Sequence, residues 1–167
     1  MRRRRSIIMG ARENDNRSEN LKFNGKEIEL AVKMLDKLET MIDIMYYLME
    51  NENQQAFVLM LLTANDMDLS MLLEKEKRET DILLEIDKEE SLYVMLCQDT
   101  KVDGGYRFAE RLIRDIELGK GTDIYCTEVE VRATHYTPKQ VILKLLETFA
   151  KSKVSNKSNE IVFRSLN

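Results

Sequence analysis

The chain has 167 residues and a mass of 19.6 kDa, and 43% of its residues are apolar while 34% are charged. This length suits one compact domain with a sizeable core. No apolar run approaches the roughly 20 residues that a membrane helix needs, so the sequence excludes a spanning segment. The first ten residues lack the apolar stretch of a secretory signal, and we therefore expect a cytoplasmic protein.

Residue types that usually carry catalysis or bind metals are scarce in this sequence. It has six glycines, one histidine (His135) and two cysteines, Cys97 and Cys126. Two distant cysteines predict neither a disulfide framework nor a zinc site. We expect both to be buried apolar residues and His135 to lie at the surface or in a turn. The sequence therefore predicts no catalytic residue, no metal site and no cofactor.

The charge is unevenly distributed along the chain. Residues 1–17 hold six arginines against Glu13 and Asp15, a net charge of +4, whereas the other 150 residues hold 20 basic and 28 acidic side chains, a net charge of −8. An acidic body argues against general nucleic-acid binding, because phosphate contacts dominate that affinity. The basic segment could contact RNA or anionic lipid. Its composition favours a disordered arm instead, and we predict that residues 1–24 form a disordered basic tail.

Residues 25–167 are predicted to form a single domain that begins with a long helix over 27–51. One face of this helix is apolar, with residues spaced three or four apart, which is typical of an amphipathic helix. The apolar residues are Leu30, Met34, Leu38, Met41, Met45 and Leu48. This face packs either on its own domain, which we favour, or on a partner helix in a dimer.

Strands and helices alternate after this first helix. The apolar run 56–62 reads as a buried strand, although its pattern alone does not separate a strand from a buried helix. Alternating residues over 124–133 predict a half-buried strand, and Thr137-Pro138 is a strong helix start. The remaining expected elements are a short helix capped by Asp68 or Ser70 and ending near Lys77, strands at 81–86 and 92–97 joined by a turn at 87–90, a helix capped by Asp103 and ending near Leu118, a helix at 139–153 and a strand at 161–163. This order predicts an α/β fold with a mixed central sheet of about five strands flanked by helices.

The order of elements, together with several short motifs, resembles the diguanylate cyclase (GGDEF) family, which has the nucleotide-cyclase-like fold. The resemblance covers about residues 27–165. Its motifs are the strand Phe57–Leu62, the segment Arg78–Asp81, the hairpin Asp87–Glu90, the helix segment Phe108–Leu112 and the strand Ile161–Phe163. The order of the elements carries more of the likeness than any one motif does.

The hairpin departs from the family's signature. In the family this hairpin carries Gly-Gly-Asp/Glu-Glu-Phe, where the glycines let the backbone approach the guanine nucleotide and the acidic residues serve metal binding and catalysis. Aligning Leu92 with the family's phenylalanine places Lys88 and Glu89 at the glycines, Glu90 at the first acid and Ser91 at the catalytic glutamate. Side chains at glycine positions obstruct a close approach of the backbone. We therefore predict a degenerate GGDEF-like domain that is not an enzyme.

Two other features bear on the same site. Asp66, after the first strand, corresponds to the family's second metal-binding acid, and with Glu90 it could hold magnesium. Two carboxylates among 30 acidic residues are weak support for such a site. Gly104-Gly105 follows the third strand, so it indicates a helix entry rather than a displaced signature.

Arg78 and Asp81 match the family's inhibitory Arg-x-x-Asp site, which binds cyclic di-GMP. An arginine can donate a pair of hydrogen bonds to guanine or to phosphate, and a carboxylate can accept guanine N–H groups. The alternative is an ion pair of little energy at a helix end, since the segment Arg12–Asp15 has the same spacing by chance. Both interpretations stay open.

The sequence thus favours a catalytically inactive, regulatory GGDEF-like domain of bacterial signal transduction. The first hypothesis is a cyclic di-GMP receptor that binds through Arg78 and Asp81. The second is a ligand-free structural or interaction module that pairs with a protein partner, or with a second copy, through the 27–51 helix.

Overall fold

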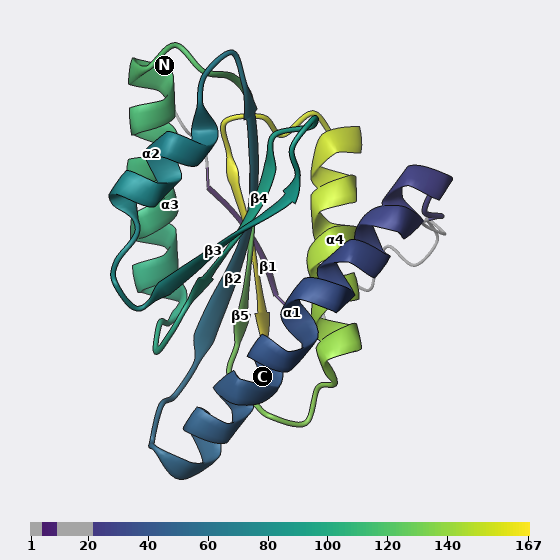
Figure 1. The fold of residues 1–167 in the computed structure, drawn as a ribbon, viewed down its shortest axis with the longest axis vertical. Helices are drawn as coiled ribbons and strands as arrows, with labels where there is room; N and C mark the ends of the chain where they lie inside the picture. Colours follow the sequence, from purple (N-terminus) through teal and green to yellow (C-terminus); the bar gives the residue numbers. More distant parts are fainter. Residues whose placement is uncertain (1–4, 10–21) are drawn as a thin grey trace.

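The computed structural model describes residues 5–9 and 22–167 and has a six-stranded mixed sheet at its centre (Figure 1). The strand order is β1-β6-β5-β2-β4-β3. Strand β2 runs antiparallel to β4 and β5, β3 runs antiparallel to β4, and β6 runs parallel to β5 and β1. The elements are β1 (Arg5–Met9), α1 (Gly25–Asn51), β2 (Phe57–Asn65), α2 (Leu69–Glu76), β3 (Asp81–Asp87), β4 (Leu92–Cys97), α3 (Val102–Leu118), β5 (Thr122–Val131), α4 (Pro138–Val154) and β6 (Ile161–Leu166).

Helices cover both faces of the sheet. Figure 1 shows α1 and α4 on one face and α2 and α3 on the other. Each face has its own apolar core, because side chains of a strand alternate between the two faces. This arrangement confirms the predicted α/β class and the mixed sheet, and β1 adds a strand to the five that the sequence suggested.

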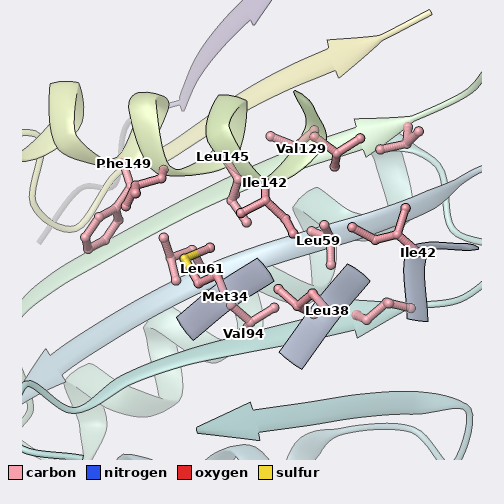
Figure 2. Close-up of a cluster of buried hydrophobic side chains, with 14 of the residues drawn as sticks. Met34, Leu38, Ile42, Leu59, Leu61, Val94, Val129, Ile142, Leu145 and Phe149 are labelled. Carbon is pink, nitrogen blue, oxygen red and sulfur yellow. The ribbon is translucent and has the colours of Figure 1, made fainter. Parts of the chain in front are cut away.

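Helix α1 packs its apolar stripe against its own domain. In Figure 2, Met34, Leu38 and Ile42 of α1 meet side chains of the sheet and of α4. Asn24 begins the helix through a capping box, in which its Oδ1 accepts the Glu27 N–H at 2.9 Å and Glu27 Oε1 accepts the Asn24 N–H at 2.9 Å. The predicted packing of this helix on its own domain is confirmed.

The prediction of a disordered tail is wrong for Arg5–Met9. These residues form β1 and pair in parallel with Ile161–Ser165 of β6, which otherwise would be the edge of the sheet. An unpaired edge offers a row of free N–H and C=O groups, and pairing them outweighed the basic composition that suggested disorder. The rest of the predicted tail, residues 1–4 and 10–21, lies outside the described residues, and residues 22–24 lead into α1.

Strand β5 is more deeply buried than its alternating pattern predicts. Residues Cys126–Val131 are buried on both faces, because α3 covers one face of the strand and α4 the other. The expected half-buried strand is therefore a central strand. Glu128 and Glu130 lie in the core beneath α3.

The helix starts are partly as expected. Asp68 caps α2 and Thr137 caps α4, each by accepting an N–H from the first turn. Asp103 does not cap α3: the N-cap residue is Lys101, whose side chain makes no capping bond, and Asp103 lies in the first turn. Within the described part of the chain, no helix is both long enough and apolar enough to cross a membrane.

Candidate functional site

The turn between β3 and β4 is tight and contains no glycine. Residues 88–91 form a turn closed by a hydrogen bond from the Ser91 N–H to the Lys88 carbonyl at 3.2 Å. Asp87 Oδ1 accepts the backbone N–H groups of Glu89 and Glu90 at 3.0 and 3.3 Å. Ser91 holds a left-handed φ of 52°. The side chains of Lys88 and Glu89 are exposed at the tip of this turn.

The two candidate metal-binding acids are engaged with different partners. Asp66 Oδ2 accepts the Thr122 hydroxyl at 2.6 Å, and the Asp66 backbone has a left-handed φ of 63°. Glu90 Oε2 lies 2.9 Å from Lys26 Nζ at the start of α1, and both side chains are largely exposed. Over residues 5–9 and 22–167, no group of three or more His, Cys, Asp or Glu residues is arranged to hold a metal ion.

Arg78 and Asp81 are brought together as a clamp at the start of β3. Arg78 Nη2 and Nε donate to Asp81 Oδ1 at 2.8 and 3.1 Å, and the Arg78 backbone N–H donates to Asp81 Oδ2 at 2.8 Å. The Asp81 side chain has no exposed surface, whereas 51% of the Arg78 side chain is exposed. The hydrogen bonds that Arg78 donates to Asp81 raise the pKa of the Arg78 guanidinium.

Thr100 and Gln98 complete this clamp, and neither was predicted from the sequence. Arg78 Nη2 also donates to Thr100 Oγ1 at 2.9 Å, and Thr100 Oγ1 donates to the Gln98 carbonyl at 2.7 Å. The Gln98 side-chain amide donates to the Thr80 carbonyl at 2.8 Å. Arg78 therefore ties the α2–β3 turn to the β4–α3 turn. The one sequence signal for this role is that Gln98 and Thr100 are polar residues just after the buried strand β4.

Asp81 belongs to a row of side chains that crosses the α3 face of the sheet. The strand register aligns Asp81 of β3 with Cys97, Val58, Glu130 and Ser165 on the following strands. Because directly opposed residues point to the same face, these side chains all lie beneath α3. No pattern in the sequence indicates this row, since its members come from five strands.

Glu130 takes the place of a side-chain cap for α3. Its Oε2 accepts the backbone N–H of Val102 at 2.7 Å, and its Oε1 accepts the Ser165 hydroxyl at 2.5 Å. A carboxylate at a helix N-terminus satisfies a free N–H group and interacts favourably with the helix dipole. Glu130 therefore supplies the capping interaction that Asp103 was expected to supply.

The cysteines and the histidine lie where the sequence predicts. Cys97 and Cys126 are free and buried, and burial raises the pKa of both thiols. Neither is a reactive thiolate in this setting. His135 is exposed in the segment before α4, where its ring stacks on Tyr136 with ring centres 4.1 Å apart.

Comparison with known proteins identifies the fold. The sequence matches no protein-family model and no curated protein. Solved structures of GGDEF domains share its architecture. The active GGEEF domain of a diguanylate cyclase from Vibrio cholerae has 10% identity and a TM-score of 0.59, and the match covers 77% of this chain and 94% of that domain. The diguanylate cyclase SiaD from Pseudomonas aeruginosa, solved in complex with its activator SiaC, has 15% identity and a TM-score of 0.64 over 92% of this chain and 70% of that chain.

A third structure, the GGDEF domain of DgcB from Caulobacter crescentus in complex with c-di-GMP, has 9% identity and a TM-score of 0.60, covering 75% of this chain and 85% of that one. At these identities the likeness concerns the path of the backbone and not the residues of a site. The resemblance noted in the sequence is confirmed at the level of the fold. This chain has the GGDEF fold.

Proposed function

We propose that residues 25–167 form a catalytically inactive signalling domain of the GGDEF fold, and that this domain works as a protein interaction module. The observation that carries the proposed loss of activity is that Asp66 and Glu90 are each bonded to a different residue. Asp66 is bonded to Thr122 and Glu90 to Lys26, and these contacts hold the two acids to different elements. The exposed side chains of Lys88 and Glu89 also occupy the hairpin positions where a nucleotide would need a bare backbone.

Incubation of the purified chain with GTP and magnesium tests the loss of activity. We expect no cyclic di-GMP by chromatography, while an active diguanylate cyclase assayed in parallel forms product. Turnover that disappears in both Asp66→Asn and Glu90→Gln would overturn the proposal. Turnover that persists in both variants would indicate a contaminating enzyme, and repurification would then remove it.

The outer face of α1 is the interface that we propose for a protein partner or a second copy. The inner stripe of this helix is already occupied by the chain's own core. Four large apolar residues remain about half exposed on α1, which are Ile28, Val32, Ile44 and Tyr47. The activator complex of SiaD shows that a protein of this fold can be bound by a protein regulator.

Sedimentation over a wide concentration range tests self-pairing through this face. We expect association that weakens in Ile44→Lys and persists in Lys37→Glu, an exposed control on the same helix. A monomer at every concentration would restrict the proposal to a different protein partner. If Ile44→Lys and Lys37→Glu associate equally strongly, the outer face of α1 is not the interface.

A second candidate function, favoured by the exposed half of Arg78, is binding of cyclic di-GMP. The contacts to Asp81 and Thr100 engage Nε and Nη2, and 51% of the side chain still faces solvent. Asp81 is fully covered, so the ligand would meet the guanidinium rather than the carboxylate. The DgcB domain, which has the same fold, was solved with c-di-GMP bound.

Calorimetric titration with cyclic di-GMP decides between the two candidates. A receptor gives heat in the native chain and in Arg114→Ala, whose arginine is exposed on α3, but none in Arg78→Lys, which keeps the charge and loses the planar donor group. Circular dichroism verifies that each variant is folded. Absence of heat in the native chain at high ligand excess would leave the interaction module as the function.

A further inference from the structure

Glu128 is a buried acid in the centre of the molecule, and none of the residues that the structure describes pairs with it. Its side chain has no exposed surface, and neither of its carboxyl oxygens has a hydrogen bond. Its neighbours across the sheet are Met60 of β2 and Phe163 of β6, which offer no polar group. Glu130, two residues further along the same strand, has both of its oxygens bonded. An unpaired buried carboxylate is far less stable than the neutral acid, so Glu128 carries a proton in this arrangement.

The first turn of α3 rests directly on this carboxyl group. A methyl group at Gly105 would lie 3.3 Å from Glu128 Oε2 and 3.2 Å from a Val58 methyl carbon. Glycine at position 105 therefore allows the helix to approach the sheet closely at this point. Gly104, its neighbour, is exposed, and a methyl group added there would meet only a Thr100 methyl carbon, at 3.4 Å.

We propose that Glu128 and the first turn of α3 form a proton-dependent switch. While Glu128 holds its proton, α3 stays seated on the sheet, and loss of the proton lifts the first turn so that water or helix N–H groups reach the carboxylate. The turn moves rather than the strands, because β2 and β6 bond to β5 on both sides. Two adjacent glycines lower the energy needed to unwind this turn.

The groups around Glu128 set the direction of the switch. Burial raises the pKa of Glu128 well above its ordinary value. Glu130 on the same face accepts hydrogen bonds from Val102 and Ser165 and offers no donor to Glu128. Cys97 of β4 and Cys126 of β5 interact with Glu128, and burial keeps both neutral.

The other elements packed around Glu128 supply little compensation. Val58 of β2 and Phe163 of β6 are apolar, and the Ser165 hydroxyl is bonded to Glu130. From α3, Asp103 is exposed in the first turn and adds negative charge, while the N–H groups of that turn are the favourable donors. The seated form therefore dominates at low pH, and the lifted form is reached as the pH rises.

Carbon-13 NMR and amide hydrogen exchange on the full chain test this proposal between about pH 5 and about pH 10. We expect the Glu128 side-chain carboxyl to titrate well above the ordinary range of a glutamate. Over the same pH range, the protection factors of amides in 105–109 should fall at least about tenfold. Amides of the central strand β2 should stay better protected than those of the first turn of α3 at every pH, although their protection also falls as the chain loses stability. Glu128→Gln, which cannot ionise, should hold α3 protection constant, and Glu110→Gln on α3 should behave as the native chain does.

Each contrary outcome overturns the switch. Titration of Glu128 near its ordinary value would show that the carboxyl is solvated, and no titration up to about pH 10 would show that the lifted form is not reached. Equal protection factors in 105–109 and in β2 at every pH would indicate that α3 opens only by global unfolding. The same pH profile in the native chain and in Glu128→Gln would assign the effect to another group. If Glu128→Gln fails to fold, Glu128→Leu provides the non-ionising variant.

Discussion

Arg78 Nη2 lies 2.8 Å from Oδ1 of Asp81, whose side chain is wholly buried although Arg78 itself is half exposed. This asymmetry decides how each residue can act. Asp81 is covered by its partner and by the turn, so it serves the stability of the fold. Arg78 faces solvent on one side and also holds Thr100, so it joins two turns and remains accessible to a ligand.

Removing the arginine should destabilise the fold more than removing an exposed charge does. In Arg78→Ala the Asp81 carboxylate stays buried and loses its charged donors, and we expect the free energy of unfolding to fall by about 2 kcal/mol. Urea denaturation measures this loss. Arg114→Ala should change stability by less than about 0.5 kcal/mol, because Arg114 is an exposed residue of α3. Equal effects of the two substitutions would show that the clamp contributes no stability.

Glu128 should make the chain less stable as the pH rises. Its folded pKa is raised above that of the unfolded chain, so its favourable contribution is complete at acid pH, below the unfolded value, and is lost as the pH rises toward the folded value. Each unit by which the folded pKa exceeds the unfolded pKa lowers the free energy of unfolding by about 1.4 kcal/mol once the pH has passed the folded pKa. In urea titrations from about pH 5 to about pH 8, Glu128→Gln should therefore gain stability relative to the native chain with rising pH.

The control for this comparison is Glu110→Gln on α3, which should follow the native chain at every pH. The amide of Glu128→Gln is itself buried, so the variant need not be more stable at any one pH. The informative quantity is how the difference in the free energy of unfolding between Glu128→Gln and the native chain changes with pH. A difference that stays constant would mean that Glu128 has the same pKa in the folded and unfolded chains.

Adjacent glycines of α3 should respond oppositely to alanine. At Gly104 the new methyl group has room, and helix propensity should raise stability by about 0.5–1 kcal/mol. At Gly105 the methyl group presses on Val58 and Glu128, and we expect a loss of about 1 kcal/mol or more. Thermal unfolding of the two variants compares them directly. Stabilisation of the same size in both would show that α3 does not rest tightly on the sheet.

Deletion of residues 1–9 should expose the edge of the sheet. Without β1, strand β6 loses its parallel partner along Ile161–Ser165, and an open edge promotes pairing between chains. We expect a lower urea midpoint and a concentration-dependent increase in sedimentation. A chain that lacks only residues 1–4 retains β1 and should behave as the full chain does. Identical stability of both deletions would contradict a structural role for β1.

The local elements could be read from the sequence because their causes are local. The apolar stripe of α1, the Thr137-Pro138 start of α4 and the turn between β3 and β4 depend on neighbours within a few residues. The order of these elements was enough to suggest the GGDEF fold. Strand β1 was missed because its stability depends on β6, which lies more than 150 residues further along the chain.

The sequence by itself determined the class of fold, the absence of glycines from the hairpin and the scarcity of histidine and cysteine. Only the tertiary structure decided which charged residues are buried and which of them have partners. Asp81 and Glu130 are buried and bonded, while Glu128 is buried without a partner. A glutamate has the same alternating position in a surface strand and in a central one. What differs is whether a helix covers that face, and helix α3 is placed by contacts between residues far apart in the chain.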